Sequence, residues 1–175
     1  VSVGTKTLDY EIVSMLYENN IRIFCVENIN GDSNETLAMI EFIRKLDSQN
    51  LIIGGNVVSG RAAKELWLSG ANIVKIGNSM NMELYGTGIP LLSSLIDCSS
   101  QKSRGEYLMC DGPISSSGDL VKALCFSDFV MSKKLFQGTF EAPTCSSNIS
   151  LESTLKALLE SILIAARMQN VSSLR

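Results

Sequence analysis

Polar residues that could do chemistry stand where short apolar runs of the sequence end. The residue pairs at these ends are Glu27-Asn28, Gly55-Asn56, Gly77-Asn78, Asp111-Gly112 and Lys133-Lys134. Carboxylates and amides can hold ligand hydroxyls, and glycines let a backbone approach a ligand closely. Because the carboxyl ends of parallel strands meet at one edge of a sheet, this recurrence favours a ligand-binding face. Strand-to-helix loops without a ligand prefer the same residue types, so both interpretations stay open.

Two features of the composition exclude other chemistries within this chain. No histidine is present, so triads that use imidazole and zinc sites that need it are excluded. The five cysteines are Cys25, Cys98, Cys110, Cys125 and Cys145. Their odd number, wide spacing and lack of a C-x-x-C pair predict reduced thiols in a cytoplasmic compartment, rather than disulfides or a zinc site.

Length and charge predict a single domain over residues 1–175. The 15 basic and 18 acidic residues give a net charge of -3, which excludes a globally basic nucleic-acid binder. No apolar run is long enough to cross a bilayer and no secretory leader is recognisable, so we expect no membrane partner. The chain starts at Val1 rather than at Met, as expected for a processed protein or for a piece of a larger one.

Two kinds of segment alternate along the chain and would position these residues. Continuous apolar runs cover residues 1–3, 21–26, 51–53, 72–76, 107–110 and 128–131. Segments with helical periodicity cover 8–18, 34–46, 61–68, 117–126 and 151–168, and Pro90 predicts the start of another helix. Ser33 or Asn34 is expected to cap the second helix, and Gly70 to end the third. The alternation predicts an α/β fold with a parallel sheet, and the continuous apolar runs predict strands that are buried on both faces.

The segment GGNVVSGRAAKELWLSGANIVKIGN (54–78) resembles the IMP dehydrogenase and GMP reductase family. That family has an A-G-N-V-x-T-G strand, a helix that ends in S-G-A-D and an I-x-K-V-G strand. Further similar segments follow the family's order: VSVGT (1–5), NGDS (30–33), GTGIP (86–90), CDGPISSSGDLVKAL (110–124) and DFVMSKKLFQGTFEAP (128–143). NGDS is nearer to the form found in GMP reductase. The resemblance implies an incomplete parallel (β/α) barrel of the TIM type, with about six βα units of the eight.

The same resemblance gives roles to several residues at the strand ends. It implies that Asp111 holds the ribose hydroxyls of a purine nucleotide, that Asn56 faces the purine, and that Glu27 stands near the nicotinamide of the cofactor. Gly77 and Gly112 match backbone positions beside the nucleotide. Since Asp and Asn at such positions also cap the next helix, a purely structural role stays open.

The phosphate-binding turns of the family are altered in this sequence. Lys133 and Lys134 replace a Gly-Gly pair, where they either grip a phosphate as point charges or fill and cap the barrel mouth. Pro113 replaces a glycine and has no N–H to donate to an anion.

The catalytic parts of the family are also missing. Residues 77–90 read GNSMNMELYGTGIP and lack the nucleophilic cysteine, the threonine pair and the arginine of the family's loop. Cys98 and Cys110 are expected to be buried apolar residues and not substitutes for that nucleophile. The short segment 144–150 cannot hold the family's mobile flap. We therefore expect no catalytic residue in this chain.

These observations favour a degenerate family member that serves as a structural or regulatory subunit, with or without a retained purine-nucleotide pocket and without a cofactor. Other protein chains would cover the two strand edges of the incomplete barrel. The alternative is an active GMP reductase or IMP dehydrogenase, seen through an incomplete sequence, that uses NADP or NAD. A third hypothesis is a new activity at an acid-rich mouth formed by Asp111, Glu27 and Glu83, although no metal-ligand spacing supports a metal there.

Overall fold

Six parallel strands form one sheet in which each strand pairs with the next one along the chain. The computed structural model describes residues 1–77, 86, 88–142 and 149–171. The strands are β1 (Ser2–Val3), β2 (Ile23–Glu27), β3 (Leu51–Val57), β4 (Ile73–Ile76), β5 (Tyr107–Asp111) and β6 (Phe129–Met131). The helices are α1 (Thr7–Glu18), α2 (Asn34–Leu46), α3 (Gly60–Leu68), α5 (Leu91–Ser100), α6 (Ser117–Leu124) and α7 (Leu151–Met168). The alternation predicted from the sequence is thereby confirmed.

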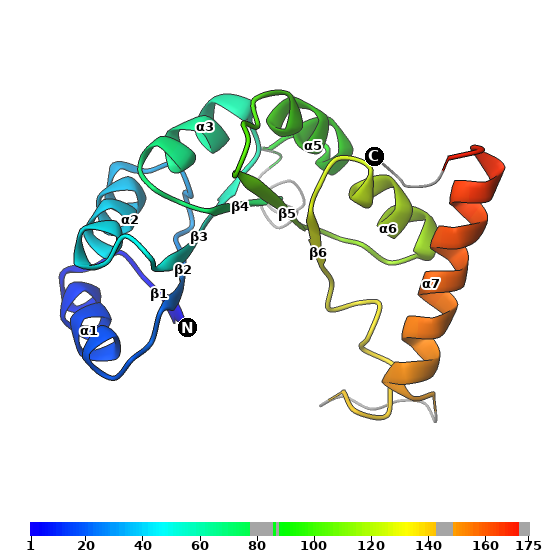
Figure 1. The fold of residues 1–175 in the computed structure, drawn as a ribbon, viewed down its shortest axis with the longest axis horizontal. Helices are drawn as coiled ribbons and strands as arrows, with labels where there is room; N and C mark the ends of the chain where they lie inside the picture. Colours follow the sequence, from blue (N-terminus) through cyan, green and yellow to red (C-terminus); the bar gives the residue numbers. More distant parts are fainter. Residues whose placement is uncertain (78–85, 87, 143–148, 172–175) are drawn as a thin grey trace.

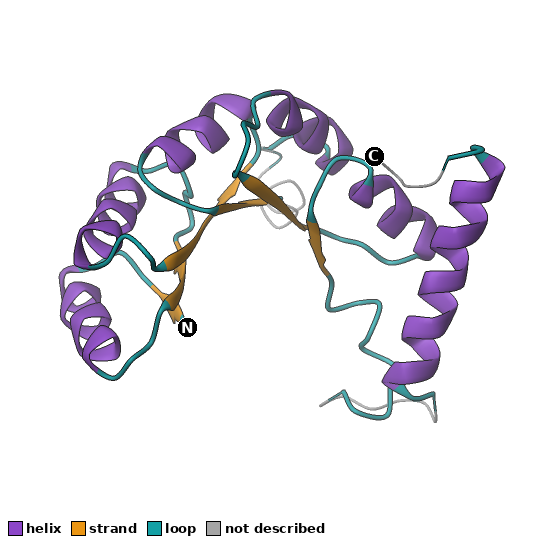
Figure 2. Cartoon of the chain, in the orientation of Figure 1, coloured by secondary structure: helices purple, strands orange, loops and turns teal. Residues whose placement is uncertain are grey.

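The sheet is bent into an arch with helices along its outer side (Figure 1; Figure 2). Helix α7 stands at the far end of the arch, beside α6. Among the helices of the described part, none has the length and apolarity needed to cross a membrane.

Serine side chains begin several of these helices. Ser33 Oγ accepts a hydrogen bond from the Thr36 amide at 3.3 Å, which confirms it as the cap of α2. Ser116 caps α6 in the same way, and the Asp119 carboxylate bonds back to the Ser116 amide. Gly70, with φ of +110°, follows α3 and provides the left-handed residue that ends it. Each cap fixes where a helix begins or ends, and therefore where the loop between that helix and the neighbouring strand lies.

The hydrophobic core lies between the outer face of the sheet and the helices. Its largest buried strand residues are Phe24, Ile52, Ile76 and Leu108, and helices contribute Met39, Ile40, Ile43, Leu66 and Leu95. These strand side chains alternate along their strands with residues on the inner face of the arch.

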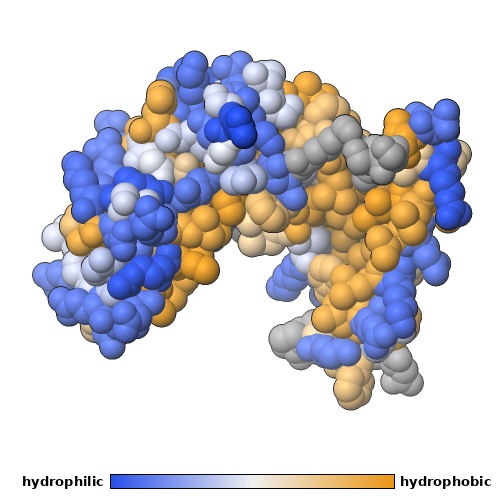
Figure 3. Space-filling model, viewed as in Figure 1, coloured by the Kyte–Doolittle hydropathy of each residue, from blue (hydrophilic) through white to orange (hydrophobic). Residues whose placement is uncertain are grey.

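The inner face of the sheet is largely uncovered. Side chains there remain half exposed, among them Ile23 (53%), Tyr107 (45%) and Phe129 (44%). The prediction that the strands are buried on both faces is correct for β4, whose four residues are all buried, and wrong for the edge and flanking strands. The continuous apolar runs supply two apolar faces, but the helices cover only the outer one. Figure 3 shows the resulting apolar surface along the inner side of the arch.

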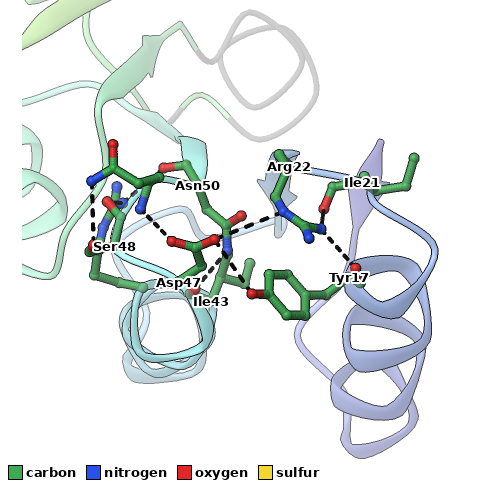
Figure 4. A network of polar contacts seen from close by, with 9 residues as sticks. Tyr17, Ile21, Arg22, Ile43, Asp47, Ser48 and Asn50 are labelled. Carbon is green, nitrogen blue, oxygen red and sulfur yellow. Dashed lines mark hydrogen bonds and ion pairs between the residues drawn. The ribbon is translucent and has the colours of Figure 1, made fainter.

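Polar contacts tie the elements together at the amino ends of the strands (Figure 4). Arg22 donates to the carbonyl oxygens of Tyr17 and Ile21 at 2.7 and 2.9 Å, and its guanidinium lies over the Tyr17 ring, 4.0 Å from the centroid. Arg22 also lies 3.9 Å from an Asp47 carboxylate oxygen. These contacts connect the end of α1 to the end of α2, at the edge of the sheet opposite to the candidate site.

Candidate functional site

A cluster of polar side chains lies at the carboxyl ends of four adjacent strands. Glu27 ends β2, Asn56 lies near the end of β3, Lys75 lies in β4 and Asp111 ends β5. Lys75 Nζ lies 2.5 Å from Glu27 Oε1 and 3.8 Å from Asp111 Oδ2. Asn56 Nδ2 donates to the same Asp111 Oδ2 at 2.9 Å. We refer to these four residues as the strand-end cluster.

Lys75 is the buried centre of the strand-end cluster. Its residue is 2% exposed, whereas the side chains of Glu27 and Asp111 are 51% and 31% exposed. Burial acts to lower the pKa of Lys75, but the hydrogen bond to Glu27 and the neighbouring negative charges outweigh it and raise that pKa. The hydrogen bond from Lys75 in turn lowers the pKa of Glu27. Both groups are therefore charged near neutral pH, and the cluster carries one positive and two negative groups.

Glu27, Asn56 and Asp111 were predicted from the sequence as site residues, whereas Lys75 was not. The signal was a single charged residue in the otherwise apolar strand Ile73–Ile76. A lysine is almost never fully buried unless it is paired, so its position in a buried strand already required a carboxylate partner.

At Gly77 and Gly112, the two glycines selected from the sequence, neighbouring atoms lie so close to the backbone that no side chain would fit. Gly77 has φ of +147°, and a Cβ at this position would clash with the Asp111 carbonyl oxygen, which would be only 1.9 Å away. A Cβ on Gly112 would lie 2.4 Å from Leu91 Cδ2. Packing between β4, β5 and α5 thus accounts for both glycines without a ligand.

The two lysines that follow β6 are exposed, and contacts among the described residues do not join them to the strand-end cluster. Lys133 lines a cavity of about 500 Å³ together with Phe136, Gln137 and Leu155, beneath the start of α7. The proposal that Lys133 and Lys134 grip a phosphate stays a prediction.

Burial makes three of the described thiols poor nucleophiles. Burial raises the pKa of Cys110 to about 11 and that of Cys98 to about 12. Burial also raises the pKa of Cys25, whose Sγ lies 3.7 Å from Glu27 Oε1. Cys98 lies in α5 and Cys110 in β5, and the prediction that both are buried is confirmed.

Within the ranges that the structure describes, no three His, Cys, Asp or Glu side chains are arranged to hold a metal ion. The ammonium group of Lys75 already provides a cation between Glu27 and Asp111. Glu83, the third member of the suggested acidic mouth, lies outside the described residues, as do most of the loop 77–90 and of the segment 144–150.

The strand-end cluster is suited to binding hydroxyl groups rather than to bond making. The hydrogen bond and the ion pair of the Asp111 side chain among the described residues both fall on Oδ2, so they leave Oδ1 as an acceptor on a side chain that is one-third exposed. A carboxylate held by an amide and an ammonium group has a fixed orientation, which is what recognition of a diol needs.

Comparisons with known proteins agree with the sequence resemblance. The model of the IMP dehydrogenase / GMP reductase domain matches residues 1–172. GMP reductase of Buchnera aphidicola subsp. Schizaphis graminum is 33% identical over 168 residues, which cover 91% of this chain and 47% of that protein. Inosine-5'-monophosphate dehydrogenase of Staphylococcus aureus (strain Mu50) is 30% identical over 135 residues, covering 73% and 28%.

A solved structure of GMP reductase from Trypanosoma brucei in complex with guanosine 5'-triphosphate superposes with a TM-score of 0.86 at 27% identity. The match covers 99% of this chain and 42% of that one. The chain thus spans about half the length of the curated GMP reductase that it matches, and its fold is that of a partial TIM-type barrel. The family model covers nearly every residue, and the chain belongs to the IMP dehydrogenase / GMP reductase family, nearer to GMP reductase.

Proposed function

We propose that this chain keeps the scaffold and a purine-nucleotide pocket of its family but does not itself carry out the reductase or dehydrogenase reaction. One observation carries this proposal: the sequence from Gly77 to Pro90 contains no cysteine. Cys98 in α5 and Cys110 in β5, the next two cysteines along the chain, are buried and have raised pKa values. A covalent mechanism needs a thiolate beside the substrate, and neither of these groups provides one.

The strand-end cluster supports the retained pocket. Asp111 presents a carboxylate oxygen, Oδ1, that no contact among the described residues uses, at the edge of the sheet where parallel α/β folds bind ligands, and Asn56 fixes its orientation. The resemblance gives Asp111 the ribose hydroxyls, and the matched structure from Trypanosoma brucei is a complex with a purine nucleotide. The ligand that we propose is therefore a purine nucleotide such as GMP or IMP.

The role that follows is that of a structural or regulatory subunit of a larger assembly, in a reducing compartment such as the cytoplasm. The four cysteines in the described ranges are free thiols, which supports that compartment.

An active oxidoreductase is the second candidate, and one observation favours it. Glu27 stands where the family has an acidic residue near the nicotinamide, and it is held in place and ionised by Lys75. If the chain belongs to an active enzyme, NADP or NAD is its cofactor and another loop supplies the nucleophile.

Calorimetric titration of the full chain with GMP and with IMP, together with an NADPH oxidation assay, separates the two candidates. We expect nucleotide binding without turnover. Asp111→Ala should weaken binding at least about tenfold, since hydrogen bonds to a charged group contribute about 1.5–3 kcal/mol each. Glu152→Ala is the control, because Glu152 is an exposed carboxylate on α7 that pairs with Lys156. Turnover that disappears in Asp111→Ala would establish the second candidate. Failure of both nucleotides to bind would remove the pocket from the proposal.

A further inference from the structure

Lys75 is the one charged residue of β4, and packing alone does not account for it. It alternates with Val74 and Ile76 of the hydrophobic core, so its side chain lies on the opposite, inner face of the sheet. That side chain is 3% exposed. An apolar residue would fill the same place without the cost of burying an ammonium group. The charge at this position therefore has a role that an apolar side chain could not fill.

The backbone of β3 lets the Lys75 side chain pass from β4 to β2. Strand β3 lies between these two strands, and its Gly55 is the register partner of Glu27. A Cβ on Gly55 would lie 2.7 Å from the Lys75 carbonyl oxygen and 2.9 Å from Lys75 Cβ, so no other residue fits there. Across this glycine, Lys75 Nζ reaches Glu27 Oε1 at 2.5 Å. The ammonium is thus held in one place by the packing of the sheet.

Two carboxylates from different strands share this single ammonium. The titratable groups that act on it are Glu27 and Cys25 from β2 and Asp111 from β5. Burial raises the pKa of Cys25, so its thiol is neutral near pH 7. Asn56 also bonds to Asp111 Oδ2, but it brings no charge. Without Lys75, the two carboxylates would repel each other with no cation between them.

We propose that Lys75 is a positioning residue of the nucleotide pocket, which holds Asp111 as an anion against the negative charge of Glu27 and leaves Oδ1 for the hydroxyls of the ligand. This inference rests on the proposed function, because it concerns the same pocket. Lys75 does not touch the ligand in this account. It acts through Asp111, whose Oδ2 lies 3.8 Å from its Nζ.

A purely structural role for Lys75 makes different predictions. If it only stabilised β4, its replacement would weaken nucleotide binding equally at every pH, and the identity of residue 27 would not matter. If it positions Asp111, the effect must depend on pH and on the charge of Glu27. Two neighbouring carboxylates that have lost their cation share a proton more readily, and a protonated Asp111 is a poorer acceptor for a diol.

Calorimetric titration with GMP at about pH 8 and about pH 5.5 separates these roles. Lys75→Met should weaken binding at least about tenfold, and more at the lower pH. Adding Glu27→Gln to Lys75→Met should recover most of the loss and remove its dependence on pH, since no second carboxylate remains to repel Asp111. Lys75→Gln, which keeps a donor without the charge, should behave like Lys75→Met and serves if that variant does not fold.

The matched control is Lys102→Met. Lys102 also pairs with a carboxylate, at 2.9 Å from both oxygens of Asp128, but at the amino ends of the strands. Its replacement should leave the affinity for GMP within about twofold at both pH values. Far-ultraviolet circular dichroism checks that all variants fold.

A measurement without ligand keeps this inference separate from the proposed function. The carbon-13 signal of the Asp111 carboxyl group should begin to change at a higher pH in Lys75→Met than in the parent chain, and this difference should disappear when Glu27→Gln is added. If the parent chain bound neither GMP nor IMP, the proposed function would fail and this signal would still decide the role of Lys75. An unchanged Asp111 signal, or a loss of affinity that neither pH nor Glu27→Gln alters, would overturn the proposal.

Discussion

At the scale of residues, the strand-end cluster combines a buried cation with carboxylates that are partly in water. Lys75 is 2% exposed, whereas the Glu27 side chain is 51% exposed. Removal of either member leaves the other without its partner, and the two unpaired groups differ in whether water can hydrate them. An unpaired carboxylate at Glu27 can be hydrated, but an unpaired ammonium at Lys75 cannot.

This asymmetry predicts unequal effects of two substitutions. Glu27→Ala should lower the free energy of unfolding by about 3 kcal/mol, the lower end for a broken buried pair, since Asp111 remains 3.8 Å from the ammonium. Lys75→Met should change it by no more than about 1 kcal/mol, because a buried charge is replaced by an apolar side chain of similar length. Urea denaturation of both variants measures these values. The double variant should resemble Lys75→Met, and strictly additive losses would contradict the pairing.

The same pair predicts a dependence of stability on pH. The hydrogen bond from Lys75 holds the pKa of Glu27 below its ordinary value of 4.5. As the pH falls below about 4.5, Glu27 becomes protonated in the unfolded chain while it stays ionised in the folded chain. The free energy of unfolding therefore decreases until the pH has passed the lowered pKa of Glu27 in the folded chain. Glu27→Gln removes this group from the titration. The difference in unfolding free energy between the two proteins should therefore narrow as the pH falls below about 4.5, and a constant difference would contradict this prediction.

The pattern of polar residues after apolar runs predicted the residues at the strand ends, and it does not identify the centre of the cluster. Glu27, Asn56 and Asp111 stood out because each follows an apolar run, and the structure brings them within one network. Lys75 lies inside a strand, where the pattern that identifies strand ends gives no signal. Its partners depend on how β2, β4 and β5 are aligned, which is a property of the folded sheet.

At the scale of elements, the sequence predicted every described helix and strand, with boundaries that differ by a few residues. The largest difference is β3, which extends to Val57 because Gly54 to Asn56 continue the strand without apolar side chains. Helix boundaries were more accurate, since Ser33 and Gly70 mark them chemically. The burial of the inner face was predicted wrongly. An apolar run specifies what a strand can bury, and whether it does so depends on elements elsewhere.

Arg44 connects several elements at the amino ends of the strands. From the last turn of α2 it donates to the carbonyl oxygens of Gly70, Asn50 and Ser48 and to Asn72 Oδ1, at 2.6–3.2 Å. Arg44→Lys removes the planar fork that serves these acceptors, so we expect a loss of about 2–3 kcal/mol in unfolding free energy.

The control for Arg44 is Arg61→Lys. Arg61 is 77% exposed and pairs with Glu65 within one helix, so its replacement should change stability by less than about 0.5 kcal/mol. Chemical denaturation of both variants provides the comparison. Equal effects would mean that Arg44 contributes through its charge alone and not through the bonds that connect α2 to the turns before β3 and β4.

At the scale of the whole molecule, stability should decrease from the middle of the arch toward its ends. All four residues of β4 are buried and it has a strand on either side, whereas β6 has no buried residue and β1 has only two residues. Local opening follows the number of apolar contacts that must be broken, so the two edges should open at a lower free energy than the centre.

Native-state hydrogen exchange measures this gradient directly. We expect amides of β3 and β4 to exchange only through global unfolding, and amides of β5 next to the free end of the arch to exchange faster, through local opening of β6. Uniform protection along the sheet in the isolated chain would mean that the edges are already covered, and would contradict both the gradient and the open barrel from which it follows.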